Sequence, residues 1–93
     1  MVTLSTAREW LRIDGNDNDM IIQGLLMACP EYIEIATGLS VSDQTTEPMA
    51  DMVTKFLLTL WYNAEQAEAD RLQRTIDNLL KALTIRAREY NEL

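Results

Sequence analysis

The chain has 93 residues, 47% of them hydrophobic, which is enough for one small folded domain and argues against intrinsic disorder. A net charge of −7 argues against a protein that holds DNA by neutralising phosphates, and the lack of histidine removes the usual general base and metal ligand. Three glycines, two prolines and few aromatic residues favour long helices over sheets, so we predict an all-α fold, a bundle of about four helices.

The first helix is expected over residues 3–12, with the Thr3 hydroxyl accepting a hydrogen bond from an amide of the first turn. The polar stretch 14–19 then opens like a calcium-binding loop. It lacks the glycine at the sixth position and the glutamate at the twelfth that such a loop needs. We therefore interpret it as a turn, after which Asn16 or Asp17 caps the second helix.

The second helix is expected over residues 17–37, where apolar side chains recur at helical spacing. Pro30 lies inside it and removes one backbone hydrogen bond, so we predict a kink there and not a break. Gly38 suits the left-handed residue that ends a helix, with Leu39 folding back against the last turn.

Residues 40–47 are polar and show no helical period, so we expect a loop there, the most mobile part of the chain. Thr45 or Thr46 is expected to cap the third helix, residues 47–64. That helix is apolar on nearly every side, so we place it at the centre of the domain. It is too short and too charged for a membrane crossing.

Trp61 and Tyr62 are adjacent on this helix, and adjacent side chains point about 100° apart. Burying both within one subunit is therefore difficult, and we expect one of them to face a neighbouring subunit or a loop. We predict that Trp61→Ala unfolds the monomer and that Tyr62→Ala weakens assembly more than folding.

The final helix is expected over residues 70–90, with a stripe of apolar side chains whose steps alternate between three and four. This stripe is either the domain's own core face or an oligomer seam, since the spacing is close to a heptad.

The charge is unevenly distributed along the chain. Nine acids and two bases precede Lys55 (net −7), whereas six acids and six bases follow from Lys55 onward (net zero).

Cys29 is the only cysteine, so no internal disulfide can form, and its apolar neighbours predict a buried, unreactive thiol in a reducing compartment. The first ten residues lack the basic and apolar regions of a signal peptide, and we expect a cytoplasmic, unexported product.

Four short motifs then occur in a recognisable order. They are Leu11-Arg12-Ile13-Asp14, Asp19-Met20-Ile21-Ile22, Tyr32-Ile33-Glu34 followed by Thr37-Gly38, and Trp61-Tyr62. In order and spacing the chain resembles the head–tail connector (adaptor) family of tailed bacteriophages, formerly described as phage DNA-packaging proteins. The resemblance covers residues 3 to 64. The chain departs from the family pattern at Pro30 and in the charged connection 65–75.

The resemblance implies an all-helical structural subunit, assembled with itself into a ring of about a dozen copies. Its implied partners are the portal protein above and a tail-side connector or stopper protein below. DNA would pass through the ring without sequence-specific binding, at the head–tail junction of the virion, after synthesis in the host cytoplasm. No membrane, cofactor, metal or catalytic residue is implied.

We expect a single domain over residues 1–93, with the C-terminal helix 70–93 available for assembly or docking. An acidic channel wall that repels phosphates, so that DNA slides, is a further hypothesis. The neutral second half supplies bases that could meet a neighbour's acids. The candidate interface residues are Trp61, Tyr62, Arg71, Arg74, Leu79, Leu83, Arg86 and Tyr90, with Arg88 as a further base for such contacts.

Three other functions fit the sequence less well. The principal alternative is a small helical protein-binding or regulatory module without ring assembly. A helix-turn-helix DNA reader is disfavoured, because the second helix opens with acids where base-reading and phosphate-binding side chains are needed. An enzyme is disfavoured as well, because carboxylate pairs such as Glu31 and Glu34 are more simply explained as a solvated helix face.

Overall fold

The computed structural model describes residues 1–63 and 65–92. This part of the chain is all-α and contains no strand, which confirms the predicted fold class. The helices are α1 (Leu4–Leu11), α2 (Asp19–Thr37), α3 (Val41–Gln44), α4 (Pro48–Asn63) and α5 (Gln66–Asn91).

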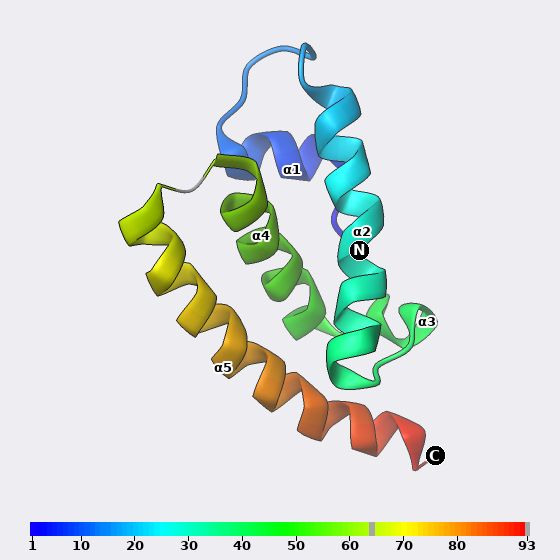
Figure 1. Cartoon of the computed structure of the whole chain (residues 1–93). Coiled ribbons are helices and arrows are strands. Elements are labelled where there is room, and N and C mark those ends of the chain that lie inside the picture. The colour runs from blue at the N-terminus through cyan, green and yellow to red at the C-terminus, as the bar shows by residue number, and fades with distance from the viewer. Residues whose placement is uncertain (64, 93) are drawn as a thin grey trace.

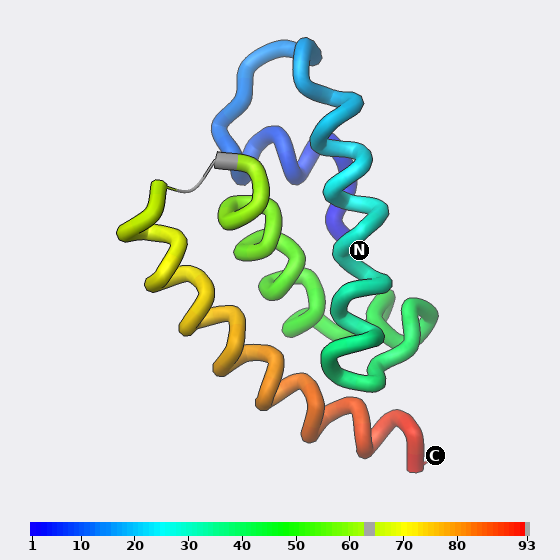
Figure 2. The backbone as a smooth tube through the Cα atoms, viewed as in Figure 1, coloured from blue at the N-terminus to red at the C-terminus, as the bar shows by residue number. Residues whose placement is uncertain are grey.

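In Figure 1 the three long helices form a layer with α4 between α2 and α5, and α2 and α5 also contact each other near their C-terminal ends, where the Asn91 amide donates to the Gly38 carbonyl at 3.4 Å. Helix α1 crosses one end of the layer, and the short α3 covers the other end, near the C-terminus of α2 (Figure 2). The molecule measures 43 × 27 × 17 Å, so its shortest dimension is less than twice the diameter of one helix. A body this thin leaves much of each long helix facing outward.

The core runs along α4, as predicted for the most apolar helix. Its buried hydrophobic residues are Ala7, Ile22, Cys29, Ile33, Leu39, Ala50, Val53, Leu57, Leu58, Ile76, Leu83 and Ala87. Helix α4 contributes four of these twelve side chains, and α2 and α5 contribute three each. The stripe of the final helix is thus mainly the domain's own core face.

The predicted ends of α1 and α2 are confirmed in part. Thr3 caps α1 and accepts a hydrogen bond from the amide of Thr6 at 3.2 Å. Helix α2 begins at Asp19 behind Asn18, and not behind Asn16 or Asp17 as predicted. The Asn18 side chain makes no capping bond, and its amide NH2 donates to the Tyr62 hydroxyl at 2.7 Å.

Helix α2 continues through Pro30 without a break. It ends where expected, at Gly38, which adopts the left-handed conformation (φ 82°) and donates its N–H to the Glu34 carbonyl. The side chain of Leu39 folds back and is fully buried. A residue other than glycine would be strained at this position.

The segment 40–47 is ordered by local bonds that a search for periodicity does not detect. It contains α3, capped by Ser40, and its Gln44 is buried with hydrogen bonds to the carbonyls of Pro30 and Leu39 at 2.9 and 3.1 Å. The expected loop was therefore wrong in part, because polar side chains here bond to the backbone instead of facing water.

The predicted cap of the next helix was also wrong. The carboxylate of Glu47, and neither threonine hydroxyl, accepts the amide N–H of Met49 at 3.1 Å at the start of α4. Thr45 and Thr46 instead donate their hydroxyls to carbonyls of α3.

Helix α5 begins at Gln66, four residues before the predicted start at residue 70, so most of the charged connection 65–75 is helical. Alanine, glutamine and glutamate at its start have high helix propensity, which explains the earlier start. Ala64, the predicted last residue of the third helix, and Leu93 lie outside the described residues.

Candidate interaction surfaces

No group of three or more His, Cys, Asp or Glu side chains among the described residues is placed to hold a metal ion. Cys29 is buried, and this burial raises the pKa of its thiol to about 12. Glu31 and Glu34 are exposed, and Glu34 accepts the Val41 amide at 3.2 Å.

Across the described ranges, none of the helices combines the length and apolar character required to span a bilayer.

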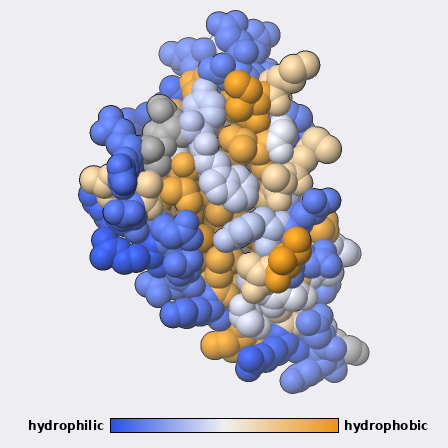
Figure 3. Space-filling model, viewed as in Figure 1, coloured by the Kyte–Doolittle hydropathy of each residue, from blue (hydrophilic) through white to orange (hydrophobic). Residues whose placement is uncertain are grey.

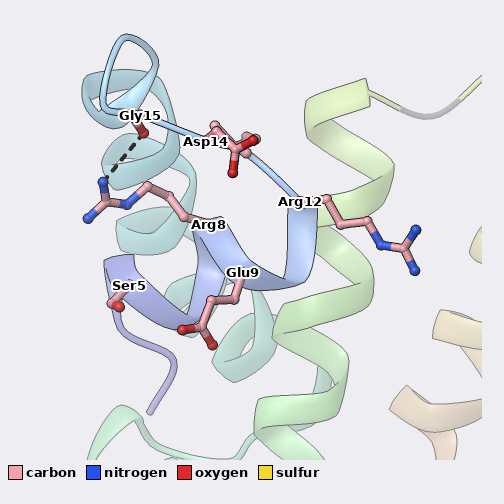
Figure 4. A pocket seen from close by; sticks show the side chains of 7 residues that line it. Ser5, Arg8, Glu9, Arg12, Asp14 and Gly15 are labelled. Atoms are coloured by element: carbon pink, nitrogen blue, oxygen red, sulfur yellow. Dashed lines mark hydrogen bonds between the residues drawn. The ribbon is translucent and has the colours of Figure 1, made fainter.

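A shallow, open hollow lies beside α1 (Figure 4). It is lined by Ser5, Arg8, Glu9, Arg12, Ile13, Asp14 and Gly15. Arg8 points to the loop, where its guanidinium donates to the Gly15 carbonyl at 3.4 Å and lies 3.7 Å from the Asp19 carboxylate. Arg12 points away from that loop. The hollow is therefore explained by Arg8 holding the loop to α1 and α2.

Trp10 attaches α1 to the central helix. Its indole N–H donates to the Thr59 hydroxyl at 2.8 Å, and its ring meets Phe56 edge to face at 6.0 Å between centroids. The ammonium of Lys55 lies 5.5 Å from the centre of the same ring. These contacts explain the partial burial of Trp10 within the monomer.

Trp61 and Tyr62 point in different directions, as expected. Their placement favours Trp61 as the residue that faces a neighbouring subunit and Tyr62 as the one that supports the monomer, the reverse of the predicted roles. Trp61 remains 37% exposed and meets the ring of Tyr32 edge to face at 5.5 Å. Tyr62 is half-buried, and its hydroxyl accepts the bond from Asn18, 44 residues earlier. Tyr62 thus joins two distant segments of the same chain, whereas Trp61 presents the larger free surface.

The C-terminal candidates separate into core and surface residues. Leu83 is fully buried in the monomer, and Leu79 and Tyr90 are half-buried against the core. Arg71 and Arg74 are exposed. The structure therefore leaves the two arginines, and not Leu83, on the outside of α5.

Arg86 is already engaged within the chain. Its guanidinium Nε lies 2.7 Å from the carboxylate of Glu47, a side chain only 3% exposed. Burial alone would raise the pKa of Glu47, but hydrogen bonds from the Met49 amide, Arg86 and Tyr90 together lower that pKa below its ordinary value. The same bond raises the pKa of Arg86. This pair joins α5 to the start of α4.

Sequence reasoning missed the outer face of α2. Met20, Met27 and Ile35 are 89%, 70% and 87% exposed, and Ile21 beside them is 59% exposed. The steps from 20 to 27 and from 27 to 35 are close to two helical turns each, so these side chains share one side. Figure 3 shows hydrophobic side chains gathered over α2. A second apolar stripe beside the core stripe was the available signal.

The outer face of α5 is different in character. Arg71, Arg74, Lys81 and Arg88 are exposed on it, and Ile85 among them is 61% exposed. In Figure 3 the flank that α5 forms is largely hydrophilic. The two outer helices thus present surfaces of unlike chemistry.

Comparison with known proteins gives one match. The family model described as "Phage gp6-like head-tail connector protein" matches residues 1–90. No curated protein and no solved structure matches the chain. The match confirms the resemblance drawn from the four sequence motifs and extends it through the C-terminal helix.

Proposed function

The chain belongs to the phage gp6-like head-tail connector protein family, a structural and non-enzymatic family, and on that premise we propose that it forms a ring beneath the portal of a tailed phage or prophage. The observation that carries this proposal is the family match over residues 1–90. In this position the ring extends the DNA channel and offers its lower surface to a tail-side connector or stopper protein.

The exposed apolar surface supports assembly into such a ring. A monomer rarely leaves an apolar face along a whole helix in water, and α2 does so from Met20 to Ile35. Unlike faces that meet head to tail produce a ring of identical subunits when the rotation closes. The thin layer of α2, α4 and α5 provides such faces on its two flanks.

The charge distribution supports passage of DNA without tight binding. The residues before Lys55 carry a net charge of −7, and the residues from Lys55 onward are neutral. Carboxylates on a channel wall repel phosphates, so DNA slides past instead of being held. Tight binding of duplex DNA at low salt, measured by fluorescence anisotropy, would contradict this part of the proposal.

The test is the mass of the assembly, measured by light scattering across a wide concentration range, with and without the cognate portal. A mass near a dozen subunits, or a ring seated on the portal in electron micrographs, is the expected result. A strict monomer that ignores the portal at every concentration would overturn the proposal. It would favour a helical protein-binding or regulatory module.

A further inference from the structure

We propose that the ring contact is made between the outer face of α2 on one subunit and the outer face of α5 on the next copy of this chain. The α2 outer face consists of Met20, Ile21, Met27, Glu31 and Ile35. The α5 outer face consists of Arg71, Arg74, Lys81, Ile85 and Arg88, and the exposed acids Asp70 and Asp77 lie along one edge of it. This inference rests on the proposed ring and specifies which surfaces close it.

The α2 outer face is large enough to matter energetically. Its four apolar side chains leave on the order of 500 Å² in contact with water, near the upper end of what a monomer exposes in one patch. A standard interface takes about 800 Å² from each partner, so this patch supplies more than half of one side. The helix is about 28 Å long, and α5 is about 39 Å long, so α5 can cover the patch from end to end.

The charges favour α5 of the next copy as the helix that covers the α2 outer face. Helix α2 contains three acids and no base, whereas α5 contains five bases and four acids. The ion pairs within the described residues involve the N-terminus, Arg8 and Arg86. No ion pair there involves the four bases of the α5 outer face, Arg71, Arg74, Lys81 and Arg88. Glu31 lies among the apolar residues of the α2 outer face, where an incoming base would meet it. Ile85 provides an apolar contact in the same region of α5.

The same charges disfavour pairing of two α2 faces. Such a contact would place Glu31 and Glu34 of one copy near those of the other, and like charges across an interface are repulsive. It would also close on itself as a dimer. Helices α2 and α5 flank α4 on opposite sides of the layer (Figures 1 and 2). An α2–α5 contact therefore leaves one unused face of each kind, so that further copies can add.

Two blocked variants test the contact. Met27→Lys places a positive charge in the middle of the α2 outer face, and Ile85→Glu places a negative charge in the middle of the α5 outer face. Both positions are well exposed, so folding is preserved, which circular dichroism and urea unfolding check. Ser5 is an exposed position on α1, outside both faces, so Ser5→Lys and Ser5→Glu are the charge controls for Met27→Lys and Ile85→Glu.

Each blocked variant alone is expected to raise the concentration needed for half-assembly by about tenfold or more, as the loss of one anchoring side chain does. Mixing the two variants brings together one intact α2 face and one intact α5 face, so dimers are expected at concentrations where each variant alone is monomeric. Assembly is measured by light scattering, and on the portal if the free protein is monomeric.

The outcomes distinguish the contact from the ring itself. A wild-type ring with both blocked variants assembling normally would overturn the contact and leave the proposed function intact. Normal assembly of Ile85→Glu, with Met27→Lys defective, would show that α2 meets another surface. A wild type that never forms a ring, with or without the portal, would overturn both proposals.

Discussion

Replacing Glu47 by glutamine should destabilise the fold, because both oxygens of its buried carboxylate accept hydrogen bonds. One of its oxygens accepts the Met49 amide at the start of α4, and the other lies 2.7 Å from Arg86 on α5. A glutamine side chain has one oxygen, so its amide group must face either the Met49 N–H or the Arg86 guanidinium. Either the Met49 N–H or the Arg86 guanidinium therefore faces the NH2 group of glutamine, and that hydrogen bond is lost.

The expected cost follows from the smaller of the two bonds. A helix-capping bond contributes about 1 kcal/mol, and loss of a hydrogen bond to a charged group costs about 1–3 kcal/mol. Arg86 is half exposed, so solvent reduces the second contribution. We expect Glu47→Gln to lower the free energy of unfolding by about 1–2 kcal/mol at pH 7, and Tm by about 5–15 °C.

The pH dependence provides a sharper check. The folded pKa of Glu47 is below the ordinary value of 4.5, so its carboxylate adds stability that is fully present above that value. This stability is lost as pH falls through the lowered folded pKa, where the protonated acid resembles the amide. The gap between wild type and Glu47→Gln should therefore persist at pH 7 and 5 and shrink towards pH 3.

The assay is urea unfolding followed by circular dichroism at these three pH values. Glu9→Gln removes an exposed carboxylate from α1 and should unfold like the wild type at pH 7. Equal stability of Glu47→Gln and wild type at pH 7 would refute the reasoning. A gap that stays constant down to pH 3 would show that the carboxylate's charge does not cause it.

Three other predictions follow from burial and bonding. Tyr62→Phe should lower the free energy of unfolding by about 1 kcal/mol in urea titrations, because it removes the hydrogen bond to Asn18. An unchanged free energy of unfolding would contradict the role of Tyr62 in joining α4 to the segment before α2. Cys29 should resist a thiol reagent in the folded protein at pH 8 and react once urea unfolds it; fast reaction without urea would contradict its burial. Leu83→Ala should cost about 2–5 kcal/mol in thermal unfolding, whereas its matched control, Ile85→Ala, should cost under about 0.5; equal losses would contradict the assigned core.

The sequence was sufficient where one local rule acts alone. Helix α4 is apolar on nearly every side, and only a central position covers all of those sides. The Thr3 cap and the Gly38 end depend on residues within a few positions of each other, so their chemistry is visible in the chain. These features follow from local sequence without any tertiary contact.

Long-range bonds account for some of the errors. In the sequence, Glu47 is indistinguishable from the other acids of a polar segment. The partner that would set it apart, Arg86, lies 39 residues away. Asn18 was not predicted as the start of α2, and its side chain is held by Tyr62. In both cases a polar side chain is used by a segment distant in sequence, and periodicity carries no information on such a pair.

The assignment of Trp61 and Tyr62 shows the same limit most clearly. Helical geometry requires the two side chains to diverge by about 100°, but it does not say which one points inward. Residue size favours burying the tryptophan, whereas the structure buries more of the tyrosine, because its hydroxyl finds a partner on the loop before α2. The surface thus left outside, Trp61 beside Tyr32, lies where α4 meets α2. Tyr32 belongs to the same helix as the exposed apolar face, so the residues most open to a neighbouring copy extend across α2 and the end of α4.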